Sequence, residues 1–568
     1  MPAALSRVSL CLGAYVLLGA FTALPAGLAR ASSGDNDASS AANHGDPEDT
    51  FRRALELEKQ RKWSAAIELY GEALDHWPDR PELSKLRVDF VHRLRLCETH
   101  YRIGRRYQDN SFRNVLLRLP RERALELYDE VLERIETQYV ENVALDQLLR
   151  RGLDNLEVAL RDPGFLKTNL TGATPERVMK LRDTFRSLRD RVTARDRAEA
   201  RAQVSSACDL ARQVVGLPAP AVVLEFVFGA TDGLNDDYSN YLTPDKLDDL
   251  YAMIDGNFVG LGVELKQDEK GLRIVGVIAG GPASEAGLKA GDRITRVDGH
   301  NVAGLGLDEA AGRLQGAEGS AVEIGVLRAD GSEIHVRLVR RPVEVKSVAQ
   351  TKIVDPSNGV GYIQLTGFQK STTDELTKAI ASLQGKGMKS LVLDVRGNPG
   401  GLLNVAVDIA ERFIDKGVIV STKGRAPGQS FVYRSRGEAI WRMPLTVLID
   451  HDSASASEIL AGALQDHRRA VIIGERSFGK GSVQSIFSLR AAPAGLKLTT
   501  AKFYSPKNRS YSEQGVEPDM PVRTAARPLR GDRPEESVPA PEFGRLDRDP
   551  ALSLAVQQAS RRPQATAR

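Results

Sequence analysis

Residues 391–402, LVLDVRGNPGGL, contain the pattern that decides the fold of the second half of the chain. Leu391 to Val395 predict a buried strand, and the glycine-rich residues after them predict a sharp turn into a helix. Apolar strands alternate with helical segments in the same way from about residue 343 to residue 523. Such alternation is typical of an α/β domain large enough for catalysis.

The glycine-rich turn, Arg396 to Leu402, also suggests a chemical role. Backbone N–H groups exposed where a strand turns into a helix can bind an anion or stabilise an oxyanion. Phosphate binding is the competing use, but this turn lacks the Gly-Lys-Ser/Thr of a Walker motif. A tight turn without a chemical role is the other alternative.

A second apolar strand, Leu445 to Ile449, leads into DHDSASASE at residues 450–458. Small residues around Ser455 leave its hydroxyl accessible near the positive end of the helix that follows, which suits a nucleophile. Ser455 and Glu458 also have the spacing of a capping box, so a structural role for this serine is the alternative.

A third strand, Val471 to Gly474, precedes a turn in which Lys480 lies between two glycines. Removal from water lowers the pKa of a lysine, and the neutral amine can then take a proton from a serine hydroxyl. The alternative is a surface lysine in a flexible hairpin.

Residues 256–342 combine short strands with glycine turns, and a hairpin is predicted around Asp330-Gly331. This region resembles a PDZ domain in four segments: FVGLGV (258–263), GPASEAGL (281–288), AGDRI (290–294) and VDG (297–299). The N–H groups of Gly260, Leu261 and Gly262 would bind a terminal carboxylate, and an adjacent strand edge would add the peptide as a strand. The expected ligand is a protein C-terminus with apolar side chains. Glycines that only make turns are the alternative.

In the order that they have along the chain, with the PDZ-like region first, the segments from about Asp232 to Pro521 resemble the C-terminal processing (tail-specific) proteases, which are serine peptidases with a Ser–Lys dyad. The resemblance covers about half of the chain. It implies that Ser455 is the nucleophile, that Lys480 is the base and that Gln484 orients the lysine. It also implies an oxyanion hole formed by the backbone N–H groups of Gly401 and Ala456, with no metal and no cofactor.

The resemblance implies a secreted serine endopeptidase that cleaves proteins at or near their C-termini, with PDZ-guided capture and an acyl-enzyme mechanism. The alternative is a non-catalytic PDZ and helical scaffold that binds protein C-termini in the cell envelope. The expected fold class is α+β with several domains. They are an N-terminal helical region (50–230), a β-rich PDZ domain (256–342), a crotonase/ClpP-like α/β protease core (343–523 with 231–255) and a disordered C-terminal tail (524–568). Within this tail we expect at most one short helix, at residues 552–558.

Other catalytic arrangements fit the sequence less well. His451 lies four residues before Ser455 in the same turn, and His467 lies at the far end of the helix, on the order of 15 Å away. A Ser-His-Asp triad is therefore disfavoured. Histidine, cysteine and carboxylate ligands do not occur at the spacing of a metal site.

Residues 1–31 have the pattern of a signal peptide, with Arg7, an apolar run and the small-x-small sequence Ala29-Arg30-Ala31. Export to the periplasm or cell envelope is expected, and an uncleaved membrane anchor is the alternative. Residues 32–49 form a flexible leader. In the helical region, residues 50–78 resemble one tetratricopeptide hairpin, and an ordinary hairpin is the alternative. This region is a candidate surface for a homo-oligomer or an adaptor.

Composition excludes several classes of protein. The chain has 568 residues, which is too long for one core, and 42% of them are hydrophobic, as in globular proteins. The 78 Lys and Arg residues nearly balance 75 Asp and Glu residues, so nucleic-acid binding has no electrostatic support. After export only Cys97 and Cys208 would remain, and whether they pair is left open by the sequence.

Overall fold

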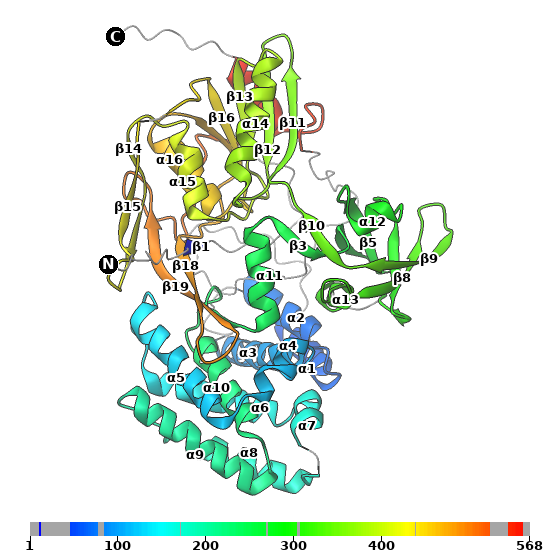
Figure 1. Cartoon of the computed structure of the whole chain (residues 1–568), viewed down its shortest axis with the longest axis vertical. Coiled ribbons are helices and arrows are strands. Elements are labelled where there is room, and N and C mark those ends of the chain that lie inside the picture. Colours follow the sequence, from blue (N-terminus) through cyan, green and yellow to red (C-terminus); the bar gives the residue numbers. More distant parts are fainter. Residues whose placement is uncertain are drawn as a thin grey trace, which may run out of the picture. The chain divides into compact units, whose positions relative to one another are not determined.

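The computed structural model describes residues 11–12, 46–77, 84–170, 172–268, 271–303, 307–437, 439–522 and 543–560 (Figure 1). The chain divides into two compact units. One contains residues 1–21, 249–485 and 500–568, and the other contains residues 22–248 and 486–499. The predicted signal peptide and most of the predicted leader lie outside the described residues, apart from the short strand β1 (Cys11–Leu12), which pairs with β18.

The N-terminal unit is helical, as predicted. Its helices are α1 (Pro47–Lys59), α2 (Trp63–His76), α3 (Ser84–Arg106), α4 (Asn110–Asn114), a 3-10 turn (Leu116–Arg118), α5 (Arg121–Gln138), α6 (Leu145–Ala159), α7 (Pro163–Asn169), α8 (Pro175–Arg189), α9 (Arg197–Val215) and α10 (Ala219–Asp232). Helix α10 is apolar along nearly its whole length, so it forms the centre of this unit and contacts α5, α6 and α9. Helices α1 and α2 form the expected hairpin, with α3 packed beside it.

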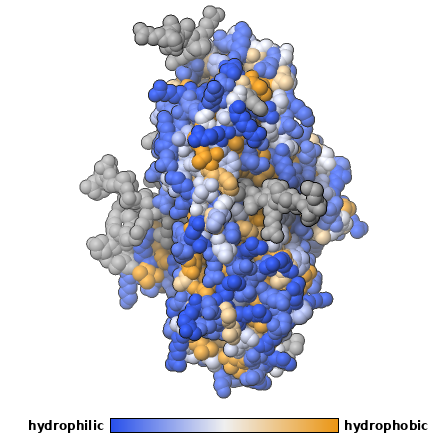
Figure 2. All heavy atoms as spheres, turned by 60° about the vertical axis from the view of Figure 1, so that its left-hand side comes forward, coloured by the Kyte–Doolittle hydropathy of each residue, from blue (hydrophilic) through white to orange (hydrophobic). Residues whose placement is uncertain are grey.

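Both remaining cysteines are buried and free, so Cys97 and Cys208 do not form a disulfide. In the described part of the chain, no helix combines the length and the apolar character needed to cross a membrane. The face drawn in Figure 2 is mainly hydrophilic, with apolar residues in scattered small groups, as is usual for protein surfaces.

The predicted PDZ region forms a sheet in the order β4 (Val263–Asp268), β5 (Gly271–Val277), β6 (Arg293–Val297), β8 (Ala321–Leu327) and β9 (Glu333–Val339), with β7 (His300–Asn301) beside β6. Helices α12 (Pro282–Glu285) and α13 (Leu307–Leu314) complete it. Strands β8 and β9 are antiparallel and flank Asp330-Gly331, so the hairpin prediction is confirmed. Before and after this domain, β3 (Asn257–Gly260) pairs with β10 (Arg341–Glu344).

The α/β core contains a sheet in the order β11 (Val348–Asp355), β12 (Val360–Leu365), β13 (Ser390–Asp394), β16 (Leu445–Ile449), β17 (Val471–Gly474) and β20 (Met520–Pro521). The strands from β12 to β20 are parallel, and only β11 is antiparallel to its neighbour. Every residue of β12, β13 and β16 is buried, as expected for parallel strands covered on both faces. The connecting helices are α14 (Thr372–Gly385), α15 (Leu403–Glu411) and α16 (Ala456–Asp466).

A second, antiparallel sheet contains β18 (Ser482–Ser488), β19 (Gly495–Tyr504), β14 (Gly417–Gly424) and β15 (Phe431–Ser435). Strand β2 (Asn240–Leu242) pairs with β19 and is followed by helix α11 (Pro244–Ile254).

The C-terminal region differs in part from the predicted disordered tail. Residues 543–560, red in Figure 1, are ordered, and α17 (Pro550–Ser560) covers the short helix expected near residues 552–558. Its apolar side chains pack against Tyr362, Val392 and Leu448 on one face of the parallel sheet. The sequence alone did not indicate this packing, because the polar and charged residues before α17 carry no apolar periodicity.

Candidate active site

Three loops meet at the carboxyl ends of the neighbouring parallel strands β13, β16 and β17. They are the glycine-rich turn (396–402), the start of α16 (455–458) and the lysine turn (477–480). We call these three segments together the catalytic corner. The carboxyl ends of parallel strands are where open α/β sheets generally carry their sites, because the loops converge there.

The glycine-rich turn is hydrogen-bonded directly to the loop before α16. The carbonyl of Asn398 accepts from the backbone N–H of Ala454 at 3.0 Å and from the hydroxyl of Ser457 at 2.8 Å. The backbone N–H of Gly397 donates to both carboxylate oxygens of Asp450, at 2.9 and 3.1 Å. Burial raises the pKa of Asp450, and the hydrogen bond from Gly397 opposes this shift. The two loops therefore form one rigid unit.

Gly400 brings this turn into contact with Ser455. Its φ angle is +106°, and a Cβ atom there would lie 2.8 Å from Cβ of Ser455 and 2.8 Å from the backbone nitrogen of Ala456. No side chain can be placed at either distance without a shift of the backbone. Glycine is required here because the turn lies directly against the serine.

Ser455 itself has an unusual backbone, with φ 56° and ψ −111° at the residue before α16. Positive φ at a residue other than glycine is uncommon and costs about 1–3 kcal/mol. A strained serine between a strand and a helix resembles the nucleophile elbow of other hydrolases, where the turn exposes the hydroxyl.

Two backbone N–H groups near Ser455 are available for an oxyanion. Ala456 opens α16, where the first N–H groups have no partner within the helix. Phe368 accepts from the N–H of Leu402 at 2.8 Å and donates to the carbonyl of Gly400 at 3.0 Å. The N–H of Gly401, between these two contacts, points away from Phe368 and donates to no acceptor among the described residues.

One buried carboxylate joins the serine to the lysine turn. Oε2 of Glu458 accepts from the backbone N–H of Ser455 at 2.7 Å and from that of Lys480 at 2.9 Å. Oε1 of Glu458 accepts from the hydroxyl of Ser477 at 2.6 Å and from the N–H of Gly479 at 2.7 Å. The backbone nitrogens of Ser455 and Lys480 are thus within two hydrogen-bond lengths of each other.

Glu458 is a residue whose main role sequence reasoning missed. It was predicted only as the partner of Ser455 in a capping box, and its bond to the N–H of Ser455 is present. Burial raises its pKa, while the bonds from Ser477 and from the backbone oppose the shift. The donors from the lysine turn lie about twenty positions further along the chain, and no local spacing in the sequence signals such a contact.

Lys480 is only 5% exposed, which excludes the alternative of a surface lysine in a flexible hairpin. Gln484 is fully buried on β18, and its side-chain N–H donates to the hydroxyl of Ser482 at 3.0 Å. The roles of Lys480 as base and Gln484 as its orienting partner remain predictions.

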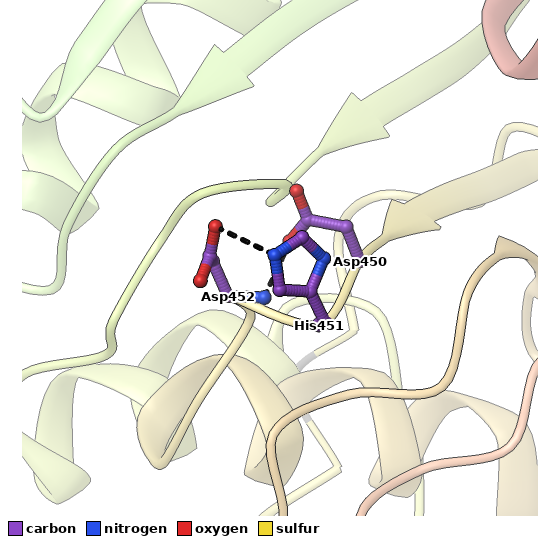
Figure 3. Close-up of side chains that lie close together, drawn as sticks. All are labelled: Asp450, His451 and Asp452. Atoms are coloured by element: carbon purple, nitrogen blue, oxygen red, sulfur yellow. Dashed lines mark hydrogen bonds and ion pairs between the residues drawn. The ribbon is translucent and has the colours of Figure 1, made fainter. Parts of the chain in front are cut away.

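The two histidines near α16, His451 and His467, contact residues other than Ser455. The half-exposed imidazole of His451 contacts Asp452 at 3.2 Å (Figure 3). It also lies 3.7 Å from the carboxylate of Glu475. The ring of His467 lies against the carbonyl of Val418 at 2.7 Å. Neither His451 nor His467 therefore forms a Ser-His-Asp triad with Ser455.

Asp450, His451 and Asp452 are close enough together to offer ligands to a metal ion (Figure 3). However, both oxygens of Asp450 already accept the N–H of Gly397, and Oδ1 also accepts from Ser453 and Asp452. The geometry is that of a carboxylate that holds a turn, and we assign no metal to it.

Comparison with known proteins finds matches to family models and to curated proteases. A model of peptidase family S41 matches residues 359–522, and a PDZ model matches residues 273–328. The chain is 39% identical over 293 residues to a carboxy-terminal-processing protease of Bartonella bacilliformis, a match that covers 50% of this chain and 66% of that protein. It is 38% identical over 294 residues to a carboxyl-terminal-processing protease of Synechocystis, covering 51% of this chain and 68% of that protein.

The chain belongs to peptidase family S41. The S41 assignment confirms the prediction of a serine-type peptidase and does not support the alternative of a non-catalytic scaffold. Among solved structures, the photosystem II D1 C-terminal processing protease is similar, with 27% identity, a TM-score of 0.40 and coverage of 70% of this chain and 92% of that one.

The S41 core is accompanied by a PDZ domain, and the predicted carboxylate-binding residues Gly260, Leu261 and Gly262 precede the stretch that matches the PDZ model. The carbonyls of Leu261 and Gly262 accept from Ala283 and Ile278, both at 2.9 Å. The N–H groups of Leu261 and Gly262 donate to no acceptor among the described residues. Gly260, the first residue of the predicted loop, ends β3 and pairs with Arg341.

Proposed function

We propose that this S41 peptidase is an exported serine endopeptidase that captures the C-termini of proteins with its PDZ domain and cleaves near them with a Ser455–Lys480 dyad. The observation that carries the proposal is the shared carboxylate oxygen of Glu458, which holds the backbones of the two residues together. The burial of Lys480 supports the same assignment, because an ammonium group loses stability when it is removed from water.

The chemistry follows from these positions. The neutral amine of Lys480 takes the proton of the Ser455 hydroxyl as its oxygen attacks the peptide carbonyl, and Gln484 orients the amine. The N–H groups of Gly401 and Ala456 donate to the oxyanion, each with a contribution of about 3 kcal/mol. The lysine then gives its proton to the leaving amine. In the second half of the reaction, Lys480 takes a proton from the water that attacks the acyl-enzyme and returns it to the oxygen of Ser455 as the acyl group leaves.

Substrate capture is the task that we assign to the PDZ domain. The unengaged N–H groups of Leu261 and Gly262 support binding of a terminal carboxylate, and the position of β4 at one end of its sheet supports addition of the peptide as an extra strand. We propose apolar side chains at the end of that peptide. The sequence pattern of residues 1–31 supports export to the periplasm or cell envelope, with the helical region as a surface for an adaptor or a second copy.

The test uses the purified protein and two loosely folded substrates that differ only in the last three residues, apolar in one and acidic in the other. We expect cleavage of the apolar-tailed substrate to be faster, and Ser455→Ala and Lys480→Ala each to reduce cleavage at least about 1,000-fold. Lys507→Ala is the matched control, because this lysine is exposed on the surface. An acyl-enzyme trapped by rapid quenching would carry the substrate fragment on Ser455.

Cleavage that survives both Ser455→Ala and Lys480→Ala would reject the dyad. Equal rates for the two substrates would reject PDZ-guided selection of apolar tails while leaving the dyad intact.

A further inference from the structure

The glycine-rich turn begins at a completely buried arginine. The guanidinium of Arg396 donates to both oxygens of Asp394, at 2.9 and 2.6 Å, and to both oxygens of Asp549, at 2.9 and 2.6 Å. All three side chains have no exposure to solvent. Burial lowers the pKa of Arg396, but the hydrogen bonds and charges of the two aspartates outweigh this and raise it. Such bidentate pairs fix the position as well as the charge of an arginine.

Asp549 belongs to the C-terminal segment, Phe543–Ser560, which we call the C-terminal clamp. Its Oδ1 accepts from the N–H of Leu552 at 3.0 Å, and its backbone carbonyl accepts from Ser553 at 2.9 Å, so Asp549 is tied to the start of α17. Buried apolar residues of α17 hold that helix against the parallel sheet. The ring of Phe543 lies 4.4 Å from the Arg396 guanidinium carbon. Asp549 therefore has a fixed position relative to the strands.

The clamp holds the first residue of the turn, Arg396. Gly397 and Asn398, the residues after Arg396, are bonded to the loop before α16, as described above. Arg396, in contrast, is bonded to the clamp. The clamp also lies outside the region that matches the S41 family, residues 359–522. Two different parts of the chain thus fix the turn that carries Gly401.

We propose that Asp549 is a positioning residue for the oxyanion hole, acting through Arg396 on the turn that presents the N–H of Gly401. The inference rests on the proposed function for its catalytic consequence. Without the carboxylate of Asp549, the guanidinium of Arg396 would keep its two hydrogen bonds to Asp394 and lose its two hydrogen bonds to the clamp. The expected result is a more mobile turn in a folded protein. Displacement of a catalytic group by about 1 Å can reduce a rate about 100-fold.

The experiment compares the full-length wild type with Asp549→Asn and two controls. Asp547→Asn changes an exposed aspartate two positions away. Val556→Ala weakens the packing of α17 without touching Arg396. Amide hydrogen exchange of the fragment that spans residues 395–402 measures turn mobility without any need for activity. The values of kcat and KM for a short peptide, and the affinity for a peptide boronic acid that mimics the tetrahedral intermediate, measure the oxyanion hole.

We expect Asp549→Asn to speed exchange at residues 395–402 at least tenfold and to lower kcat about 10- to 100-fold with little change in KM. Boronate affinity should fall in parallel, while both controls keep wild-type kcat per titrated active site. If Asp549→Asn does not fold, Asp549→Glu, which keeps the charge but lengthens the side chain, should show the same pattern more weakly.

Unchanged exchange at residues 395–402 would overturn the proposal, even if the wild type proved to have no peptidase activity. Faster exchange with unchanged kcat would also overturn it, because the mobility of the turn would then have no effect on the oxyanion hole. If Val556→Ala lowered kcat and speeded exchange as much as Asp549→Asn does, at the same loss of melting temperature, Asp549 would only stabilise the fold.

Discussion

The catalytic corner and the carboxylate-binding loop of the PDZ domain are both made of glycine-rich backbone, yet they are held in place differently. In the corner, buried charged side chains fix the backbone: Glu458, Asp450 and the Arg396 pairs. In the PDZ loop, main-chain hydrogen bonds from Ala283 and Ile278 do so. The difference teaches where single side chains matter. Substitutions that remove one charged group should disrupt the corner, whereas the PDZ loop should respond mainly to changes of backbone conformation.

The largest expected effect is that of Glu458→Gln. The amide of glutamine would place N–H donors against donors from Ser455, Lys480 or Gly479, which leaves buried donors unpaired. We expect kcat to fall at least about 100-fold, because the serine and the lysine lose their common anchor. Glu517→Gln, at an exposed glutamate, is the control and should be neutral. Wild-type kcat in Glu458→Gln would show that the carboxylate does not hold the dyad.

Gly400→Ala should come next. Its Cβ would approach Ser455 and the nitrogen of Ala456 at distances that real Cβ atoms do not show, so the turn or the serine must move. A loss of about 100-fold in kcat is expected, with a normal affinity for tail peptides. The matched control is Gly397→Ala in the same turn: its φ is also positive, at +67°, but no atom lies within 4 Å of the added carbon. The free energy of unfolding of that variant should fall by only about 1 kcal/mol, because the added carbon strains the backbone and clashes with nothing.

The pH dependence offers a third test, in which activity and stability move in opposite directions. Burial raises the pKa of Glu458 above its ordinary value of 4.5. Between 4.5 and the raised pKa, the folded protein keeps a proton that the unfolded chain has lost. The stability that this proton contributes is fully present below pH 4.5 and is lost as the pH rises through the folded-state pKa. Ionised Glu458, however, is the form that accepts all four hydrogen bonds, so activity should rise over the same interval.

The measurement is a pair of profiles between pH 4 and 7: kcat for the wild type, and the difference in melting temperature between wild type and Glu458→Gln. We expect kcat to increase with pH. Over the same interval, the melting temperature of the wild type should fall relative to that of Glu458→Gln. The proposed base, Lys480, acts in the same direction on activity, because only its neutral form takes a proton. A flat activity profile down to about pH 5 would contradict the assignment of Lys480 as the base.

Much of the fold and of the site could be predicted from the sequence because the signals are local. The strand at Leu391–Val395, the turn after it and the helix after Ser455 each follow from a few neighbouring residues, and the structure contains all three. The hairpin around Asp330-Gly331 is another such case. The burial of Lys480, in contrast, was one of two alternatives that the sequence left open.

The contacts that sequence reasoning missed are those made between distant segments. Asp549 binds Arg396 across 153 positions, and its neighbours in the sequence are charged and have no periodic apolar pattern. Glu458 has a strong local explanation as a helix cap, and this explanation hides its bonds to the lysine turn. A buried carboxylate that serves two loops therefore cannot be distinguished from an ordinary cap until the tertiary structure brings the second loop to it.

The smallest effect is expected in the PDZ loop, and it completes the comparison. Gly262 has φ +75°, and a Cβ there would lie 3.3 Å from Cα of Gly281, so Gly262→Ala strains the loop without a severe clash. We expect the dissociation constant for an apolar-tailed peptide to rise about tenfold, equivalent to about 1.4 kcal/mol. Leu261→Ala, which leaves the backbone amide in place, should change it less. Both are measured by calorimetry with Ser455→Ala as the background, so that the peptide is not cleaved.

Because the loop is fixed by its main chain, kcat for a short peptide without a tail should remain at the wild-type value in the Ser455-containing protein. A larger effect for Leu261→Ala than for Gly262→Ala would show that a side chain, and not the backbone, maintains this loop.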